Sequence, residues 1–404
     1  MTIRVSANAN ACTHVERAII LIGKEIINLS GPVRRVFASG RLPAPPPGPS
    51  EAPCGCAGGL LGITMKPSKP ESLPMIDKKI VVVATGGTIA MKYDEQKGGL
   101  VPACTGEDLA AAVPGLGEIA PLEFVQFTNV ASPAMTPQLM WELHCKLEEV
   151  LARDDVAGAI VTHGTDTLEE TSYFLDLLHT SDKPIVTTAA MRGADEAGPD
   201  GPMNIYCAVK TAASREAVGM GVLVCLNETL HAPGEVMKTH SANPATFESP
   251  WWGPVGYVDP DRVVMRRKPL GVVRFAPKAL TARVDVVKAM TGVGREYVDF
   301  AVSQGCRGIV IEGFGRGNVP PAMTAGLADA VKAGVAVVLT TRTPGGRVLD
   351  VYGYPGSVTD TRNAGAAMGG EISAAKARLK LMIILSEHPE LAKDRDALER
   401  LFDV

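Results

Sequence analysis

Two short segments of the chain place threonine hydroxyls directly after apolar runs typical of a buried strand. The first, VVVATGGTIAM (residues 81–91), passes from β-branched residues into Thr85 and Thr88, which flank two glycines. The second, VTHGTDT, follows a glycine with Thr165 and Asp166. Glycine at such a point allows a tight turn or a close approach of the backbone to a ligand. A purely structural turn and an exposed reactive hydroxyl both fit this pattern.

A threonine hydroxyl is a weak nucleophile unless a neighbouring base takes its proton. Asp166 adjoins Thr165, but a carboxylate with an ordinary pKa of about 4 is a weak base for this step. A lysine in a low-dielectric pocket is better suited, and Lys238 follows another strand-like run, VLVCLNET (222–229). His163, between the strand and the turn, is expected to be a buried, hydrogen-bonded turn residue rather than a catalyst.

The elements that must position these side chains alternate along the chain. Helix-like segments with apolar residues at helical spacing separate the strand-like runs, and Thr136 is a predicted N-cap. The expected strands lie at 79–87, 183–191 and 221–229, a strand with its turn is expected at 156–167, and the expected helices lie at 136–153, 168–180 and 201–214. This order predicts an α/β fold with a doubly wound, mainly parallel sheet. Ligands of such sheets bind beyond the carboxyl ends of the strands, where both Gly-Thr turns fall.

Composition suggests four regions. Residues 1–75 are rich in Pro, Gly and Ala and are interpreted as a disordered or poorly ordered extension; alternatively, translation starts at Met65 or Met75. Residues 76–268 are expected to form an N-terminal α/β catalytic domain and 269–282 a linker. The alternation then resumes, so 283–404 are expected to form a smaller C-terminal α/β domain.

Bulk properties exclude several classes of function. The chain has 404 residues, 46% of them apolar, a net charge of -4 and no basic block, which argues against a nucleic-acid partner. Its eight cysteines are scattered and show no zinc-ligand spacing, so we expect no metal site and a reduced, cytoplasmic protein. No apolar run is long enough to cross a membrane, and Lys24 and Glu25 interrupt the one segment similar to a secretory signal.

Taken together, the motifs TGGTIA, HGTDTLEET, AMR…DGPMN and MKT…ATF resemble those of the bacterial-type L-asparaginase/glutaminase family, over about residues 77–385. The resemblance implies an amidohydrolase that converts L-asparagine to L-aspartate and ammonia through a threonine nucleophile and an acyl-enzyme. It also implies that no metal or cofactor takes part. Members of this family work as homodimers or homotetramers on a small amino-acid amide.

Family roles map onto four catalytic positions. Thr88 matches the threonine usually assigned as the nucleophile, while Thr165, Asp166 and Lys238 match a triad that polarises a hydroxyl or the attacking water. Some accounts make the equivalent of Thr165 the direct nucleophile, and that alternative stays open here. Asp166 also corresponds to a residue that binds the α-ammonium group of the substrate.

Further positions match less completely. Ser132 matches a serine that binds the substrate α-carboxylate, Ala190 a carbonyl that contacts the scissile amide, and Tyr93 a tyrosine of a mobile lid. Asn318 matches an asparagine that reaches the site of a neighbouring subunit; alternatively, it caps the helix begun by VPPAMTAG. Pro133 stands where the family commonly has Gln or Glu. It leaves open a glutaminase-asparaginase or an amidase for a modified asparagine.

One interpretation from another class is a catalytically silent amino-acid-binding protein. The presence of all four catalytic positions argues against it. Arg192 and Asp200 are expected to be framework ion pairs and turn formers, and Trp251 and Trp252 core or interface aromatics.

Overall fold

The computed structural model describes most of the chain. Residues 76–87, 89, 113–269 and 272–403 are described in full, and 18–22, 25–29, 91–94 and 99–102 by their backbone alone. The chain divides into two compact units, 1–66 and 67–404. The described residues of the first unit form an antiparallel hairpin of β1 (Ala18–Ile22) and β2 (Glu25–Leu29). The rest of the expected extension, 1–75, lies outside the described residues.

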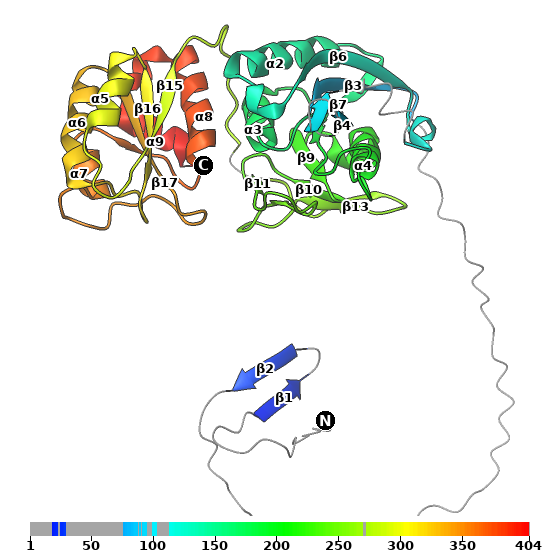
Figure 1. Ribbon diagram of the computed structural model, residues 1–404, viewed down its shortest axis with the longest axis horizontal. Coiled ribbons are helices and arrows are strands. Elements are labelled where there is room, and N and C mark those ends of the chain that lie inside the picture. Colours follow the sequence, from blue (N-terminus) through cyan, green and yellow to red (C-terminus); the bar gives the residue numbers. More distant parts are fainter. Residues whose placement is uncertain are drawn as a thin grey trace, which may run out of the picture. The chain divides into compact units, whose positions relative to one another are not determined.

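The second unit begins with an eight-stranded sheet in the order β14-β13-β10-β9-β8-β7-β3-β6 (Figure 1). Strands β6, β3, β7, β8 and β9 are parallel, whereas β10, β13 and β14 extend the sheet with antiparallel pairing. The bounds are β3 Lys79–Gly86, β6 Leu122–Val130, β7 Val156–Thr162, β8 Ile185–Thr188, β9 Val222–Leu226, β10 Thr229–His231, β13 Gly256–Val258 and β14 Val263–Met265. The predicted doubly wound, mainly parallel sheet is confirmed, with an antiparallel edge that the sequence analysis did not anticipate.

Alternate residues of β3 pack against different helices because successive side chains of a strand point to opposite faces. Ile80 and Val82 share a core with α4, while Val81 and Val83 share another with α2. The helices are α2 (Pro137–Leu151), α3 (Leu168–Leu178) and α4 (Gly201–Ala213). Thr136 is the N-cap of α2 as predicted, since its Oγ1 accepts a hydrogen bond from the N–H of Leu139 at 3.2 Å.

A smaller parallel sheet, β15-β16-β17-β18, forms the C-terminal lobe (Figure 1). Its elements are β15 Val284–Lys288, α5 Glu296–Ser303, β16 Gly308–Gly313, α6 Pro321–Lys332, β17 Ala336–Thr341, α7 Val358–Asn363, β18 Ala367–Met368, α8 Ala374–Glu387 and α9 Arg395–Phe402. Helices α5 and α6 pack on one face of this sheet and α8 on the other. The expected second α/β domain is therefore present.

Helix α8 also packs against α3 of the N-terminal lobe. One apolar cluster includes Phe174 and Leu177 of α3 together with Leu381 and Ile384 of α8. The two lobes thus share a continuous core, which fixes the loops that lie beside α3.

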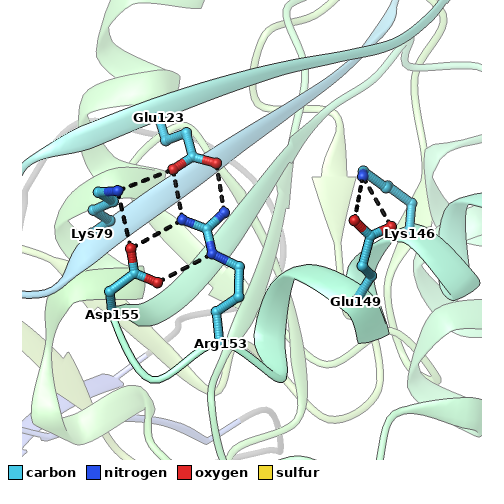
Figure 2. A network of polar contacts seen from close by, with 6 residues as sticks. All are labelled: Lys79, Glu123, Lys146, Glu149, Arg153 and Asp155. Carbon is cyan, nitrogen blue, oxygen red and sulfur yellow. Dashed lines mark hydrogen bonds and ion pairs between the residues drawn. The ribbon is translucent and has the colours of Figure 1, made fainter.

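A charged network closes the amino end of the large sheet (Figure 2). The Arg153 guanidinium donates to both carboxylate oxygens of Glu123 on β6 and of Asp155, and Lys79 on β3 bridges the same two acids. A separate pair, Lys146 with Glu149, lies on α2. These side chains are partly solvent-exposed, so the network fixes the register of neighbouring elements more than it stabilises the fold.

Candidate active site

The two Gly-Thr turns meet at the carboxyl ends of the neighbouring strands β3 and β7. Gly87 has φ +87°, and a Cβ at this position would lie 2.3 Å from the backbone nitrogen of Gly164. A Cβ at Gly164 would in turn lie 3.2 Å from Cα of Gly87. Only glycine allows the two backbones to approach so closely. Thr88, which follows Gly87, lies outside the described residues.

Lys238 joins Thr165 and Asp166 at this rim. Its Nζ donates to Thr165 Oγ1 at 2.9 Å and to Asp166 Oδ1 at 2.7 Å. The lysine side chain is 17% exposed and that of Asp166 58%, whereas Thr165 is buried. Three of the four positions expected to carry the chemistry therefore form one hydrogen-bonded cluster, although more than 70 residues separate Lys238 from the other two.

The short strand that carries Lys238 is held by the helix that follows the second turn. Among the described strands, β11 (Met237–Lys238) pairs only with β12 (Phe247–Glu248). Its position relative to the large sheet depends on Glu169 in the first turn of α3, whose Oε2 accepts the backbone N–H of Lys238 at 2.6 Å. Sequence reasoning missed this role of Glu169. The signal available was an acidic residue in the first helical turn after the motif, with no hint of its distant partner.

Ser132 lies beside the second turn. Its side chain is buried, its Oγ accepts from the N–H of Asp166 at 3.2 Å, and its carbonyl accepts from Thr167 Oγ1 at 2.9 Å. A Cβ at Gly164 would lie 2.6 Å from this Oγ, so the serine packs directly on the glycine. Ser132 opens a short 3₁₀ helix, η3 (Ser132–Ala134), whose next residue is the exposed Pro133.

His163 is a buried turn residue, as predicted. Its Nδ1 lies 2.7 Å from the carbonyl of Gly164, which can only accept, so Nδ1 carries the hydrogen. Nε2 then accepts from the hydroxyl of Thr171 at 3.0 Å. Burial lowers the pKa of His163 to about 4, so the ring is neutral and braces the turn near neutral pH.

The neighbouring strand β8 ends in a turn organised by Asp200. This carboxylate accepts the backbone N–H groups of Met191 and Arg192, each at 3.0 Å, which confirms Asp200 as a turn former. Arg192 donates its guanidinium to the carbonyl of Gly198 at 3.0 Å, and the described contacts show no ion pair between it and Asp200, contrary to expectation. Ala190 is buried in this turn, one strand away from Thr165.

Two of the remaining expected residues belong to other elements. Asn318 belongs to the C-terminal lobe, where its Oδ1 accepts from the N–H of Val358 at the start of α7, at 3.2 Å. The interpretation of Asn318 as the cap of the next helix is wrong, because Pro320 occupies the N-cap of α6 and makes no side-chain cap. Tyr93 belongs to a hairpin of β4 (Met91–Asp94) and β5 (Gly99–Pro102) that is described by its backbone alone.

Trp251 and Trp252 are not core residues, since they are 62% and 59% exposed. Both side chains line a cavity, and bulky aromatic residues often lie at the surface where they cover one. Among the described residues, no group of three or more His, Cys, Asp or Glu side chains could hold a metal ion. No described helix has the length and hydropathy needed to cross a membrane.

A threonine hydroxyl, a lysine amine and a carboxylate together at the rim of an α/β sheet are groups that hydrolysis through a hydroxyl nucleophile can use, so the fold and the site indicate a hydrolase. Comparison with known families agrees with this class. The model of the N-terminal asparaginase domain matches residues 79–271, and that of the glutaminase/asparaginase C-terminal domain matches 283–402. The chain belongs to the asparaginase family, as its motifs predicted.

This chain matches two curated relatives over nearly the whole length of each relative. An L-asparaginase of Bacillus licheniformis is 36% identical over 321 residues, which are 79% of this chain and 99% of the relative. A probable periplasmic L-asparaginase of Haemophilus influenzae is 32% identical over 352 residues, 85% of this chain and 97% of the relative. Among solved structures, a probable cytoplasmic L-asparaginase of Campylobacter jejuni is similar with a TM-score of 0.72 and 30% identity, over 80% of this chain and 99% of that one.

Proposed function

We propose that this protein is an amidohydrolase that converts L-asparagine to L-aspartate and ammonia. The observation that carries the proposal is the position of Lys238 Nζ between Thr165 Oγ1 and Asp166 Oδ1, at 2.9 and 2.7 Å, in a chain of the asparaginase family. A hydroxyl hydrogen-bonded to an amine can lose its proton to that amine. The carboxylate orients the amine and balances its charge.

In the first half-reaction, the Thr88 hydroxyl attacks the carbonyl carbon of the substrate side chain. Its proton passes through Thr165 Oγ1 to the Lys238 amine and then to the amide nitrogen. The carbon–nitrogen bond breaks, ammonia leaves, and a β-aspartyl ester of the threonine remains. Backbone N–H groups of the two Gly-Thr turns stabilise the negative charge that develops on the carbonyl oxygen.

In the second half-reaction, water attacks the ester. The pair of Thr165 and Lys238 takes the proton of this water, and the ester bond breaks to release aspartate and restore the threonine hydroxyl. The same geometry also serves the alternative in which Thr165 is the nucleophile, because Lys238 contacts its oxygen directly.

Three further residues orient the substrate in this proposal. Ser132 Oγ binds the α-carboxylate, the Asp166 carboxylate binds the α-ammonium, and the Ala190 carbonyl contacts the amide nitrogen. The support is that Ser132 and Asp166 lie together at the rim of the sheet, since Ser132 Oγ accepts the N–H of Asp166. The carboxylate of Asp166 accepts from Lys238 and is more than half exposed, so a ligand can reach it. Tyr93 is proposed to belong to a lid over this rim.

Pro133 favours a second candidate activity within the same class. Its ring is exposed next to Ser132 and offers no hydrogen bond, whereas Gln or Glu there would contact the substrate. A site lacking this contact can accept glutamine or an N-substituted asparagine as well.

Steady-state ammonia release from L-asparagine, L-glutamine and N-substituted asparagines tests both candidates. We expect the highest kcat/KM for L-asparagine. A higher value for L-glutamine or for a substituted asparagine would favour the second candidate. Tight binding of aspartate without ammonia release from any amide would instead show a silent amino-acid-binding protein.

The working form is proposed to be a homodimer or homotetramer, with Asn318 reaching toward the site of a neighbouring subunit. Support comes from large apolar side chains exposed along β15, α5 and the loop between them, namely Val286, Met290, Tyr297 and Phe300 at 40–62% exposure. Light scattering coupled to size-exclusion chromatography measures the assembly. A monomer at micromolar concentration would contradict this part.

The proposed location is the cytoplasm. Four described cysteines are free thiols: Cys145, Cys207, Cys225 and Cys306. Disulfides are rare in the reducing cytosol, and the Campylobacter jejuni neighbour is named as cytoplasmic, although the Haemophilus influenzae relative is named as periplasmic. Fractionation of the source cells would locate the protein directly.

A further inference from the structure

A cavity of about 650 Å³ lies beside α3 and α8, and its lining includes Glu169 and Met237, which adjoin the strand that carries Lys238. Its walls include Tyr173 of α3, Lys376 and Lys380 of α8, and Trp251 and Gly345 from two loops, but no member of the Thr165–Asp166–Lys238 cluster. The volume is typical of sites that bind small organic molecules. The proposed hydrolysis assigns no role to this cavity.

Two lysines on successive turns of α8 face this cavity. Lys376 and Lys380 are 3% and 4% exposed, which is rare for lysine. Lys376 donates to the carbonyl of Val236, and its Nζ lies 6.0 Å from the ring of Tyr173. The Nζ of Lys380 lies 5.1 Å from the ring of Phe402 and has no hydrogen-bond partner among the described residues.

Three carboxylates line the cavity, and none forms an ion pair with Lys380 in the described part of the chain. Glu235 is paired with Arg267, and Glu169 accepts a backbone N–H of β11. The third, Glu371, is exposed to solvent. Burial alone lowers the pKa of Lys380 to about 8, with no acidic side chain opposing that effect. A buried cation without a counter-charge is costly, so this wall of the cavity is suited to an anionic group.

Aromatic rings also line the cavity. The indole N–H of Trp251 donates to the carbonyl of Pro344 at 2.8 Å, which ties a loop of the N-terminal lobe to one of the C-terminal lobe. A Cβ at Gly345 would lie 2.2 Å from the indole ring, so glycine is required for this contact. Trp252 lies beside it, more than half exposed. Such a surface binds an apolar or aromatic body by stacking and burial.

We propose that this cavity binds a small organic anion with an aromatic or aliphatic body, whose anionic group pairs with Lys380 and whose body lies against Trp251 and Trp252. The ligand supplies the counter-charge that Lys380 lacks within the described chain. Its carboxylate or phosphate group accepts hydrogen bonds from the ammonium, which are stronger than those between neutral groups.

Tryptophan fluorescence of the full chain tests the site, because two of the three tryptophans line it. The probes are phenylacetate, phenyl phosphate and the neutral 2-phenylethanol. We expect saturable binding of at least one anionic probe with a Kd of about 1 mM or below, and binding of 2-phenylethanol at least about tenfold weaker. Phenylacetate against phenyl phosphate distinguishes a carboxylate from a phosphate ligand. Equal binding of neutral and anionic probes, or binding of none, would overturn the proposal.

Lys380→Met keeps the length of the side chain and removes its charge. Loss of one charge-assisted hydrogen bond should weaken the anionic probe at least about tenfold, while the melting temperature should rise because an uncompensated buried charge is gone. Lys332→Met, on an exposed side chain of α6, is the matched control and should change neither. Undiminished affinity in Lys380→Met would contradict the assignment.

A competition experiment distinguishes this cavity from the site around Lys238. It is the one test of this proposal that rests on the proposed function. Saturating L-aspartate should leave the affinity of the anionic probe unchanged. Displacement of the probe would place it at the Lys238 site and overturn the proposal. Failure of the proposed function would show in the ammonia assay and would leave the dependence on Lys380 intact.

Discussion

Individual side chains at the Lys238 site are held by partners from distant parts of the chain. Glu169 fixes the backbone of Lys238, and Ser132 fixes that of Asp166. Neither bond is visible in the sequence, because each joins residues that come together only when the sheet has formed. The amine, hydroxyl and carboxylate are therefore placed by the fold before any ligand binds, as preorganised catalysis requires.

Acid should destabilise the protein through His163. Its pKa of about 4 lies below that of an unfolded histidine, about 6.5, so the stabilisation is complete above pH 6.5 and is lost as pH falls toward 4. His163→Gln should make the pH dependence of the free energy of unfolding less steep in this window, by up to about 1.4 kcal/mol per pH unit. Urea titrations from pH 7 to 4 measure it. Identical slopes for His163→Gln and the parent would show that protonation of His163 does not limit stability in acid.

Among the elements, α2 begins at a defined side-chain cap. Thr136→Ala removes the acceptor for the N–H of Leu139 and should lower the free energy of unfolding by about 1 kcal/mol. Thr136→Ser keeps the oxygen and should restore most of the loss. Thermal unfolding of the three proteins checks this, and an alanine variant as stable as the parent would refute the cap.

The sequence predicted the elements whose signals are local. The β-branched run 79–87 and the Leu repeat of α2 show the periodicity of a buried strand and of an amphipathic helix. The antiparallel strands β10, β13 and β14 have three residues each, too few for an alternating pattern to be recognised. Their place in the sheet depends on pairing between distant segments, which no local pattern records.

The candidate site was predicted in part for the same reason. Parallel strand ends share one rim, so the meeting of the two Gly-Thr turns followed from the fold class. The burial of Lys376 and Lys380 did not, because a lysine on a helix normally lies in solvent. Helix α8 is covered by its own sheet on one side and by α3 on another, and only the assembled lobes show this.

Across the whole molecule, the core that joins the lobes predicts cooperative unfolding. Phe174 is fully buried in the cluster shared by α3 and α8, so Phe174→Ala should cost about 3–5 kcal/mol and lower a single transition. Circular dichroism reports both lobes. Tryptophan fluorescence reports the N-terminal lobe, which contains all three tryptophans, together with the contact of Trp251 with the C-terminal lobe. Val218→Ala, at a side chain 57% exposed, is the control. Two separate transitions would contradict a shared core.

The most direct test of the proposed chemistry is ammonia release from L-asparagine by the parent, Lys238→Met and Thr88→Val, each with its fold checked by circular dichroism. The parent should release ammonia at steady state. Lys238→Met should lose at least about 10³-fold in kcat, because no amine remains to take the hydroxyl proton, and Thr88→Val should lose turnover because it removes the attacking oxygen and keeps the side-chain shape. Activity of Lys238→Met within about tenfold of the parent would contradict the account.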